Sequence, residues 1–169
     1  MELEPLGEQH LGGLTALIAD PEVLHFTRIP EPPPADFERS WIARYEQGRA
    51  EGTSEAFAIV EDGRFLGVAL APHIEPEDQE AELGYIVARE ARGRGVATEA
   101  LRRLTRWAFD ELGMQRLVLI IESANAPSVR VAERSGYQLE GVLRSTHLKQ
   151  GRRIDALQYS RLPTDPEPN

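Results

Sequence analysis

The stretch from Arg92 to Thr98 has the residue types of a loop that binds phosphate groups. Gly93 and Gly95 stand at alternate positions, after a run of strand-forming residues and before an amphipathic helical pattern. Two glycines let the backbone approach a ligand closely, and the first N–H groups of the helix point outward with the positive end of its dipole behind them. The order strand, glycine turn, helix start therefore predicts a site for a pyrophosphate.

Several kinds of glycine loop bind phosphates, and the spacing discriminates among them. A Walker loop needs Gly-Lys-Ser/Thr, and residues 92–98 contain no lysine. The dinucleotide fingerprint needs a third glycine where Thr98 stands, and no clear acidic strand end follows about twenty residues later. Residues 92–97 instead have the form Arg/Gln-x-x-Gly-x-Gly/Ala, which resembles the acetyl-coenzyme A signature of the GNAT acetyltransferases. A tight turn with solvated arginines is the structural alternative.

A second signature lies at residues 125–137, where Asn125, Ser128 and the pair Gly136-Tyr137 are spaced as Asn-x-x-Ser, seven further residues and Gly-Phe/Tyr. This stretch also resembles the GNAT family, and two motifs in the right order are more specific than either alone. Shorter matches extend the resemblance over residues 2–162; they are Asp20 to Val23, Ala81 to Tyr85 and Asp155 to Ser160. Together they are most similar to the RimJ/RimL branch, whose members acetylate protein N-termini, notably those of ribosomal proteins.

Acetyl transfer to an amine requires a group that takes the amine proton, and Glu82 is the candidate base. A protein α-amine has a reference pKa of about 7.7 to 8.0 and a lysine about 10.4, so the α-amine is easier to present in its neutral form. Glu82 lies on the strand that leads to the glycine loop, and the resemblance implies the same role for it, directly or through a water. A surface glutamate is the structural alternative for Glu82, and His73 is the alternative base or proton shuttle.

Ser128 is the candidate acid for the departing thiolate, because the resemblance implies this role for the serine of the Asn-x-x-Ser motif. Capping a helix is its rival role, and either Ser128 or Asn125 would be a preferred cap residue. The resemblance also implies that Asn125 binds the pantetheine arm. Tyr137 is expected in the core, with proton donation as its alternative.

Backbone N–H groups near Val87 and along the glycine loop are expected to bind the acyl and pyrophosphate groups of acetyl-coenzyme A. Arg92, Arg94 and Arg130 would add phosphate contacts or remain solvated. The predicted catalytic residues are Glu82 and Ser128, and no metal ligand is expected. The residues predicted to bind the cosubstrate are Val87, Arg92, Gly93, Arg94, Gly95, Val96, Ala97, Thr98, Asn125 and Ser128.

Periodicity and turn signals predict the elements that position these residues. They are, in chain order, a strand at 2–6, a helix from Glu8 that ends at Asp20-Pro21, a helix from Pro34 to Gly48, strands at 56–61, 64–70 and 80–87, a helix that Gly113 closes, a strand at 116–122, a short helix at 128–134 and two strands around 149–152. The order β-α-α-β-β-β-α-β-α-β-β predicts an α+β fold with a mixed sheet, antiparallel in its first half. A crossover helix would then place strands 80–87 and 116–122 in parallel, which is also the GNAT arrangement.

Length and composition predict one domain over residues 1–162 and a disordered tail over 163–169. The longest purely apolar run, residues 117–121, is far shorter than the roughly 20 residues of a membrane helix. The acidic N-terminus lacks the features of a signal peptide, so we expect a cytoplasmic protein without a membrane partner. The chain has no cysteine, and its four histidines show no ligand spacing, so neither a disulfide nor a metal site is expected.

The net charge of −9 is unevenly distributed, with −13 over residues 1–90 and +4 over residues 91–169. The basic part would suit an anionic cosubstrate, and the acidic part would attract a cationic acceptor or merely keep the protein soluble. Free nucleic acid is a poor partner for such a chain because its binding depends on phosphate neutralisation.

The sequence leaves the acceptor open between a protein N-terminus, which the resemblance favours, and a small amine such as an antibiotic or a polyamine. A non-catalytic module that binds acyl-coenzyme A is a further alternative. A homodimer is also open, with the proline segment and the final hairpin as candidate surfaces.

Overall fold

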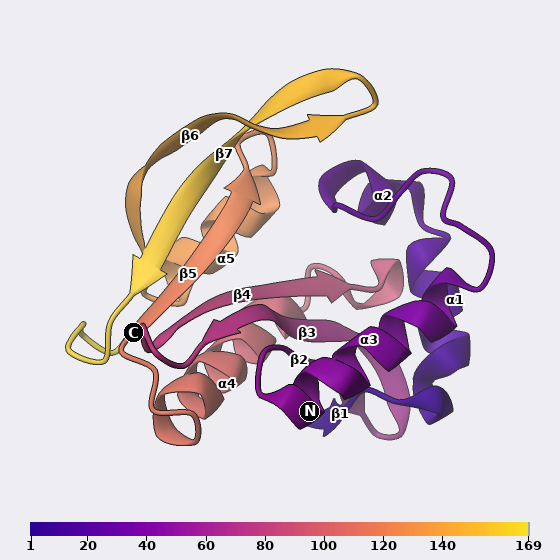
Figure 1. The fold of residues 1–169 in the computed structure, drawn as a ribbon, viewed down its shortest axis with the longest axis horizontal. Coiled ribbons are helices and arrows are strands. Elements are labelled where there is room, and N and C mark those ends of the chain that lie inside the picture. Colours follow the sequence, from indigo (N-terminus) through magenta and orange to yellow (C-terminus); the bar gives the residue numbers. More distant parts are fainter. Residues whose placement is uncertain (169) are drawn as a thin grey trace.

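A seven-stranded mixed sheet forms the centre of the protein in a computed structural model, which describes residues 1–168 (Figure 1). The strands are β1 (Glu2–Pro5), β2 (Glu55–Glu61), β3 (Arg64–Glu75), β4 (Glu80–Val87), β5 (Arg116–Glu122), β6 (Gln138–Lys149) and β7 (Arg152–Arg161). The helices are α1 (Leu11–Ile18), α2 (Pro21–Phe26), α3 (Phe37–Glu51), α4 (Val96–Asp110) and α5 (Ala126–Arg134), with 3-10 turns at Glu8–His10 and Arg89–Ala91.

The strands lie in the order β1-β2-β3-β4-β5-β7-β6. Strands β1 to β4 pair antiparallel, β4 and β5 pair parallel through the crossover helix α4, and β5, β7 and β6 are again antiparallel. The predicted α+β fold and its mixed sheet are therefore confirmed.

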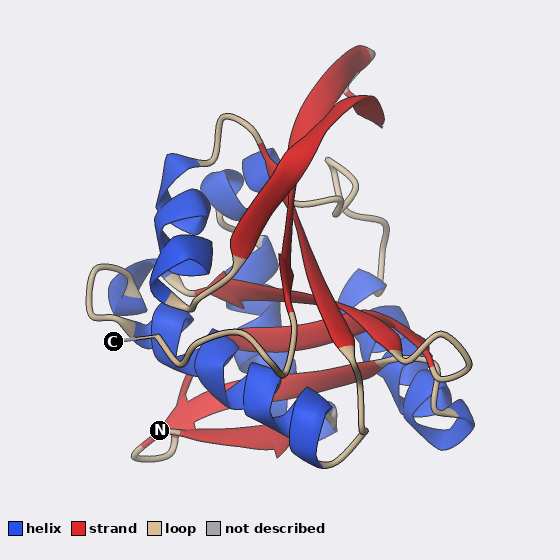
Figure 2. Cartoon of the chain, turned by 90° about the vertical axis from the view of Figure 1, so that its left-hand side faces the viewer, coloured by secondary structure: helices blue, strands red, loops and turns tan. Residues whose placement is uncertain are grey.

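Helices cover both faces of the sheet, which Figure 2 shows from the side. On one face α4 packs apolar side chains such as Leu101 and Leu104 against Leu117 and Leu119 of β5. On the other face α1 and α3 form a second apolar cluster with the first strands. The β6–β7 hairpin extends beyond the helices (Figure 1), and Gln150 at its tip donates a hydrogen bond to Glu31 in the connector between α2 and α3.

Helix α2 is absent from the predicted order, which therefore lacks one helix. The Asp20-Pro21 pair ends α1, as expected, but it also starts α2, because the Asp20 side chain accepts a hydrogen bond from the Glu22 N–H at 3.0 Å. Proline at the first position of a helix costs no hydrogen bond, so the same two residues can end one helix and begin the next.

Other predicted boundaries shift by a few residues. Helix α3 starts at Phe37 instead of Pro34, and it continues past Gly48 to Glu51. Gly48 lies inside the helix. A Cβ at this position would collide with the Ser54 hydroxyl, so the glycine is needed for packing and does not end the helix. Strand β3 reaches Glu75, five residues beyond its predicted end. Helix α5 starts at Ala126, two residues before its predicted start.

The predicted disordered tail is described up to Pro168, and residue 169 lies outside the described residues. Asp165 accepts a hydrogen bond from the Leu162 N–H at 2.9 Å, and Glu167 pairs with Arg161 at 3.4 Å. Among residues 1–168, no helix is both long and apolar enough to cross a membrane.

Candidate active site

Strands β4 and β5 separate in the middle of the sheet, and this split is the centre of the candidate site (Figure 1). Their parallel register ends at the pair Glu82 and Val118. On the β3 side, the Ala88 N–H donates to the Leu66 carbonyl at 2.8 Å. Bonded and non-bonded pairs alternate in an antiparallel ladder, so the N–H and carbonyl of Val87 point away from β3, into the split. Val87 thus presents a free N–H where the sequence predicts one.

The glycine loop leaves a run of backbone donors unused at the start of α4. Gly93 and Gly95 have φ angles of 73° and 81°, and space is open where a Cβ would lie on either. Within residues 1–168, no protein acceptor binds the N–H groups of Gly93, Arg94, Gly95, Val96, Ala97 and Thr98. Successive free N–H groups at the N-terminus of a long helix form an anion-binding site. The loop therefore fits the predicted pyrophosphate.

Arg92, a predicted phosphate contact, is engaged with carboxylates of α2. Its guanidinium lies 2.8 Å from Asp20 and 2.6 Å from Glu22, and its Nε donates to the Val87 carbonyl at 3.0 Å. Burial opposes ionisation of Asp20, but the Glu22 N–H together with Arg89 and Arg92 holds the pKa of Asp20 below its usual value. Arg92 thus fixes the loop to α2 and to the end of β4.

Arg94 and Arg130, the other predicted phosphate contacts, extend from the loop and from α5. Arg94 lies 2.9 Å from Glu61, and both side chains are more than a third exposed. Arg130 is exposed on α5. Because exposed ion pairs are weak, Arg94 can exchange its partner at little cost.

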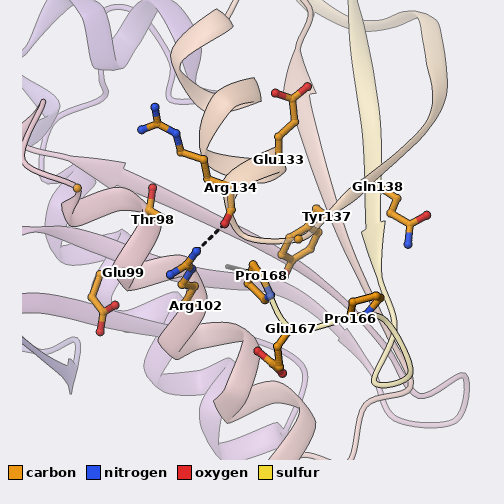
Figure 3. A pocket seen from close by; sticks show the side chains of 12 residues that line it. Thr98, Glu99, Arg102, Glu133, Arg134, Tyr137, Gln138, Pro166, Glu167 and Pro168 are labelled. Carbon is orange, nitrogen blue, oxygen red and sulfur yellow. Dashed lines mark hydrogen bonds between the residues drawn. The ribbon is translucent and has the colours of Figure 1, made fainter.

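A pocket of about 850 Å³ continues from the glycine loop between α4 and α5 (Figure 3). Figure 3 shows the Arg102 guanidinium directed at the Arg134 carbonyl, to which it donates at 2.7 Å. The lining residues are Gly95, Thr98, Glu99, Arg102, Glu133, Arg134, Gly136, Tyr137, Gln138, Pro166, Glu167 and Pro168. This pocket is large enough for the nucleotide part of a cosubstrate held by the loop.

Glu82 lies on β4 beside the split, on the sheet face opposite Tyr85 and Val87, because successive side chains of a strand alternate. His73 of β3 is its register partner. The Glu82 side chain is 18% exposed, and its Oε1 accepts a hydrogen bond from Arg28 at 2.7 Å. A pocket of about 240 Å³ adjoins it, lined by His73, Glu75, Glu80, Glu82, Val118, Ile120 and Gln158.

Ser128 lies in the first turn of α5, on the far side of the split from Glu82. The Asn125 side chain accepts the Ser128 N–H at 3.2 Å, so Asn125 is the helix cap and the Ser128 hydroxyl is not needed for that purpose. The Tyr85 hydroxyl donates to the Ser128 carbonyl at 3.3 Å and joins β4 to α5. Burial raises the pKa of Tyr85 to about 12, so this phenol stays protonated at neutral pH.

Tyr137 lies in the core, as predicted. Its side chain is almost completely buried, and its hydroxyl is 2.7 Å from the Thr105 hydroxyl. Burial raises the pKa of Tyr137 well above its usual value, although the Thr105 hydrogen bond acts in the other direction.

Tyr85, Arg28 and His147 border the split but were not singled out from the sequence. Burial lowers the pKa of His147, and the charge of Arg28 lowers it further, against the opposing effect of Glu82 and Glu122. Tyr85 was signalled only as part of a motif, and the positions of Arg28 and His147 belong to no motif. Among residues 1–168, no group of three or more histidine or acidic side chains is placed to hold a metal ion.

The site thus combines a split sheet, a loop with free N–H donors and a carboxylate at the edge of the split. The model of the acetyltransferase (GNAT) domain family matches residues 1–138. The chain belongs to this family and is an acetyl-coenzyme A-dependent N-acetyltransferase.

The chain is similar to two proteins from Escherichia coli K12 whose names give different acceptors. The chain is 29% identical to a ribosomal-protein-serine acetyltransferase over 111 residues. This match covers 66% of this chain and 62% of that protein. The chain is 25% identical to a spermidine N(1)-acetyltransferase over 143 residues. This second match covers 85% of this chain and 75% of that protein.

The fold also matches a solved structure of RimL, a ribosomal L7/L12 alpha-N-protein acetyltransferase in complex with coenzyme A. The TM-score is 0.88 at 21% identity, over 95% of this chain and 92% of that chain. At this identity the likeness concerns the fold.

Proposed function

We propose that this enzyme transfers the acetyl group of acetyl-coenzyme A to the N-terminal α-amine of a protein. The observation that carries the proposal is the position of Glu82, in the last register pair before the sheet opens and on the face opposite the α4–α5 side. An amine held at this carboxylate would face the split from one side of the sheet while the thioester enters from the other.

The donor would be held mainly by backbone groups. The free N–H groups of residues 93–98 would bind the pyrophosphate, and the Val87 N–H would bind the acyl oxygen or the pantetheine arm. The pocket between α4 and α5 would take the nucleotide. Asn125 would contribute through the turn that it caps before Ser128.

Acetyl-coenzyme A supplies an electrophilic thioester carbon and a thiolate leaving group. Glu82 would accept the proton of the incoming ammonium, directly or through a water, so that the amine nitrogen has a free electron pair. The new C–N bond replaces the C–S bond, the second amine proton passes to solvent as the amide forms, and Glu82 then releases the first proton to solvent. Ser128 would donate a proton to the departing sulfur and is reprotonated from solvent.

The charges near Glu82 favour an α-amine over a polyamine. A polyamine carries several ammonium groups and needs several unpaired carboxylates. Glu80, which also lines the small pocket, is already 2.6 Å from Arg116, and Glu122 lies 4.0 Å from Lys149. Within residues 1–168, the exposed Glu75 is then the one further lining carboxylate without an ion pair. The lower reference pKa of an α-amine also reduces the cost of presenting it in neutral form.

A panel of acceptors tests the proposal. It contains peptides with free N-termini, the same peptides with blocked N-termini and an internal lysine, and spermidine; release of coenzyme A and mass spectrometry are the measurements. We expect turnover with the free N-termini and the acetyl group on the α-nitrogen. Faster turnover of spermidine than of every peptide would overturn the choice of acceptor.

A further inference from the structure

Arg28 is the cation that holds Glu82 in this structure. It lies in the connector of residues 27–36, which joins α2 to α3. The Arg28 side chain is 57% exposed, whereas the Glu82 side chain is 18% exposed. A well-exposed cation therefore sits on a carboxylate that is mostly enclosed.

The connector is attached at a second point, farther along. The Gln150 amide, at the tip of the β6–β7 hairpin, donates to Glu31 at 2.6 Å. This contact involves no charge on Gln150 and does not depend on Arg28. The Arg28 side chain can leave Glu82 while the connector stays in place on the hairpin.

A guanidinium and an ammonium make the same kind of contact with a carboxylate, but only the ammonium can give up a proton near neutral pH. A base must lie within about 2.6 to 3.2 Å of the nitrogen that it deprotonates, or one water away. The Arg28 guanidinium nitrogen lies 2.7 Å from Glu82 Oε1, which is within that range. An ammonium that takes this place at Oε1 must displace Arg28, because two nitrogens cannot occupy the same position, so the acceptor and Arg28 compete for this oxygen.

We infer that Arg28 occupies the place of the acceptor's ammonium on Glu82, and that the acceptor binds by displacing it. The inference rests on the proposed function and refines it by naming a residue that selects the acceptor. Release of Arg28 is cheap because an ion pair with a well-exposed partner contributes little. The displaced guanidinium stays near the mouth of the site, where it disfavours a second ammonium close to the reacting amine.

The competing explanation is that Arg28 supports Glu82 in its working position. The two explanations predict opposite kinetic effects when the charge is removed. If Arg28 is a displaced competitor, removing its charge lowers the apparent KM of the acceptor and leaves kcat unchanged. If Arg28 supports Glu82, removing its charge lowers kcat.

Steady-state kinetics of Arg28→Met with a free N-terminal peptide test the inference. We expect the acceptor KM to fall roughly 1.5- to 5-fold, the range set by an exposed ion pair, with kcat unchanged. Arg28→Lys should keep a KM near that of the parent. An unchanged or higher KM in Arg28→Met, or a lower kcat, would overturn the inference.

Arg39→Met is the matched control. Arg39 pairs with Glu8 at 2.9 Å, and both side chains are nearly 60% exposed, far from the split. Its removal should leave KM and kcat unchanged. Melting curves of both variants separate a folding defect from a kinetic effect.

A second readout does not depend on turnover. Arg28, Glu82, Glu122 and Arg153 all act on the charge of His147. Removing the Arg28 charge should raise the pKa of His147, measured by an NMR titration of its ring protons. An unchanged His147 titration would show that Arg28 does not lie at this position in solution. If the parent acetylates no amine, the proposed function fails, and the titration still reports on Arg28.

Discussion

The two sides of the split are built in different ways. The proposed donor side consists of the backbone of one continuous stretch, residues 92–98, at the start of a 15-residue helix. The proposed acceptor side consists of side chains from distant segments, with Arg28 before α3, Glu82 on β4 and His147 on β6. Backbone donors tolerate most side chains, whereas a site made of side chains changes with each substitution. The donor side can therefore persist while the acceptor side diverges.

The largest expected effect is on the acceptor side. Glu82→Gln keeps the shape of the side chain but cannot take a proton, so kcat should fall by roughly 10²- to 10⁴-fold while donor affinity stays near that of the parent. Turnover and calorimetric titration with acetyl-coenzyme A measure the two quantities. Glu8→Gln, in an exposed ion pair elsewhere, is the control. Full turnover at a pH where most of the amine is protonated would assign the proton transfer to His73 or to water.

The donor side has no side chain to delete, so it is tested by filling its space. Gly95→Val places a branched side chain in the open region above the loop, and we expect the Kd for acetyl-coenzyme A to rise at least about tenfold. Valine at a φ of 81° also strains the backbone by about 1 to 2 kcal/mol.

Gly52→Val is the matched control for that strain. Gly52 has a φ of 72°, open space around it and a position at the end of α3. It should lose similar stability and retain donor binding. Equal donor affinity in Gly95→Val and the parent would remove the loop from the donor site.

Ser128 and Asn125 are neighbours on the donor side with separable duties. Ser128→Ala should lower kcat by up to about 10²-fold with little change in stability, because the cap is Asn125. Asn125→Ala should cost about 0.5 to 2 kcal/mol in the free energy of unfolding. A donor with a more acidic thiol should partly restore Ser128→Ala and should not restore Glu82→Gln. A fully active Ser128→Ala with the ordinary donor would exclude the hydroxyl from the reaction.

The smallest effect is expected at Glu140, whose charge supports the sheet. Arg116, together with Gln158 and Ser160, lowers the pKa of Glu140 to about 2. A carboxyl whose pKa is lowered by folding stabilises the fold at pH values above its unfolded-state pKa of about 4.3. This contribution is lost as the pH falls toward 2. Glu140→Gln should therefore lose about 1 kcal/mol at pH 7, since the side chain is about a third exposed, and much less near pH 2. Urea unfolding at both pH values measures this, and an equal loss at both would contradict it.

The geometry of the proposed donor side could be predicted from the sequence because its information is local. Glycine spacing and the strand–turn–helix order lie within about fifteen residues, and the structure places free N–H groups there. The antiparallel first half of the sheet and the parallel pair across α4 followed from the same signals. Helix α2 was missed because Asp20-Pro21 can both end one helix and start the next. Gly48 was taken for a helix end because a periodic pattern does not show that Ser54 packs against it.

On the proposed acceptor side, the sequence singled out Glu82 and, as the alternative base, His73. Arg28 is 54 residues from Glu82 in the sequence, and its contact arises from how the α2–α3 connector lies against β4. His147 is positioned by the hairpin, where it pairs with Ile154. No spacing rule links residues that meet through tertiary packing, so these two side chains could not be assigned from the sequence.

The split leaves β4 with two kinds of surroundings. Its first half is an interior strand between β3 and β5, and its second half, from Leu83 to Val87, has a strand neighbour on one side only within residues 1–168. Apart from the Val87 carbonyl, which Arg92 occupies, such a half-strand offers the kind of amide row that lets other sheets recruit an extended peptide. The pantetheine arm of coenzyme A carries amide groups of its own and can lie along this row as a substitute strand. Donor binding would then complete the secondary structure of the protein, and the enzyme would have its full sheet only while it is loaded.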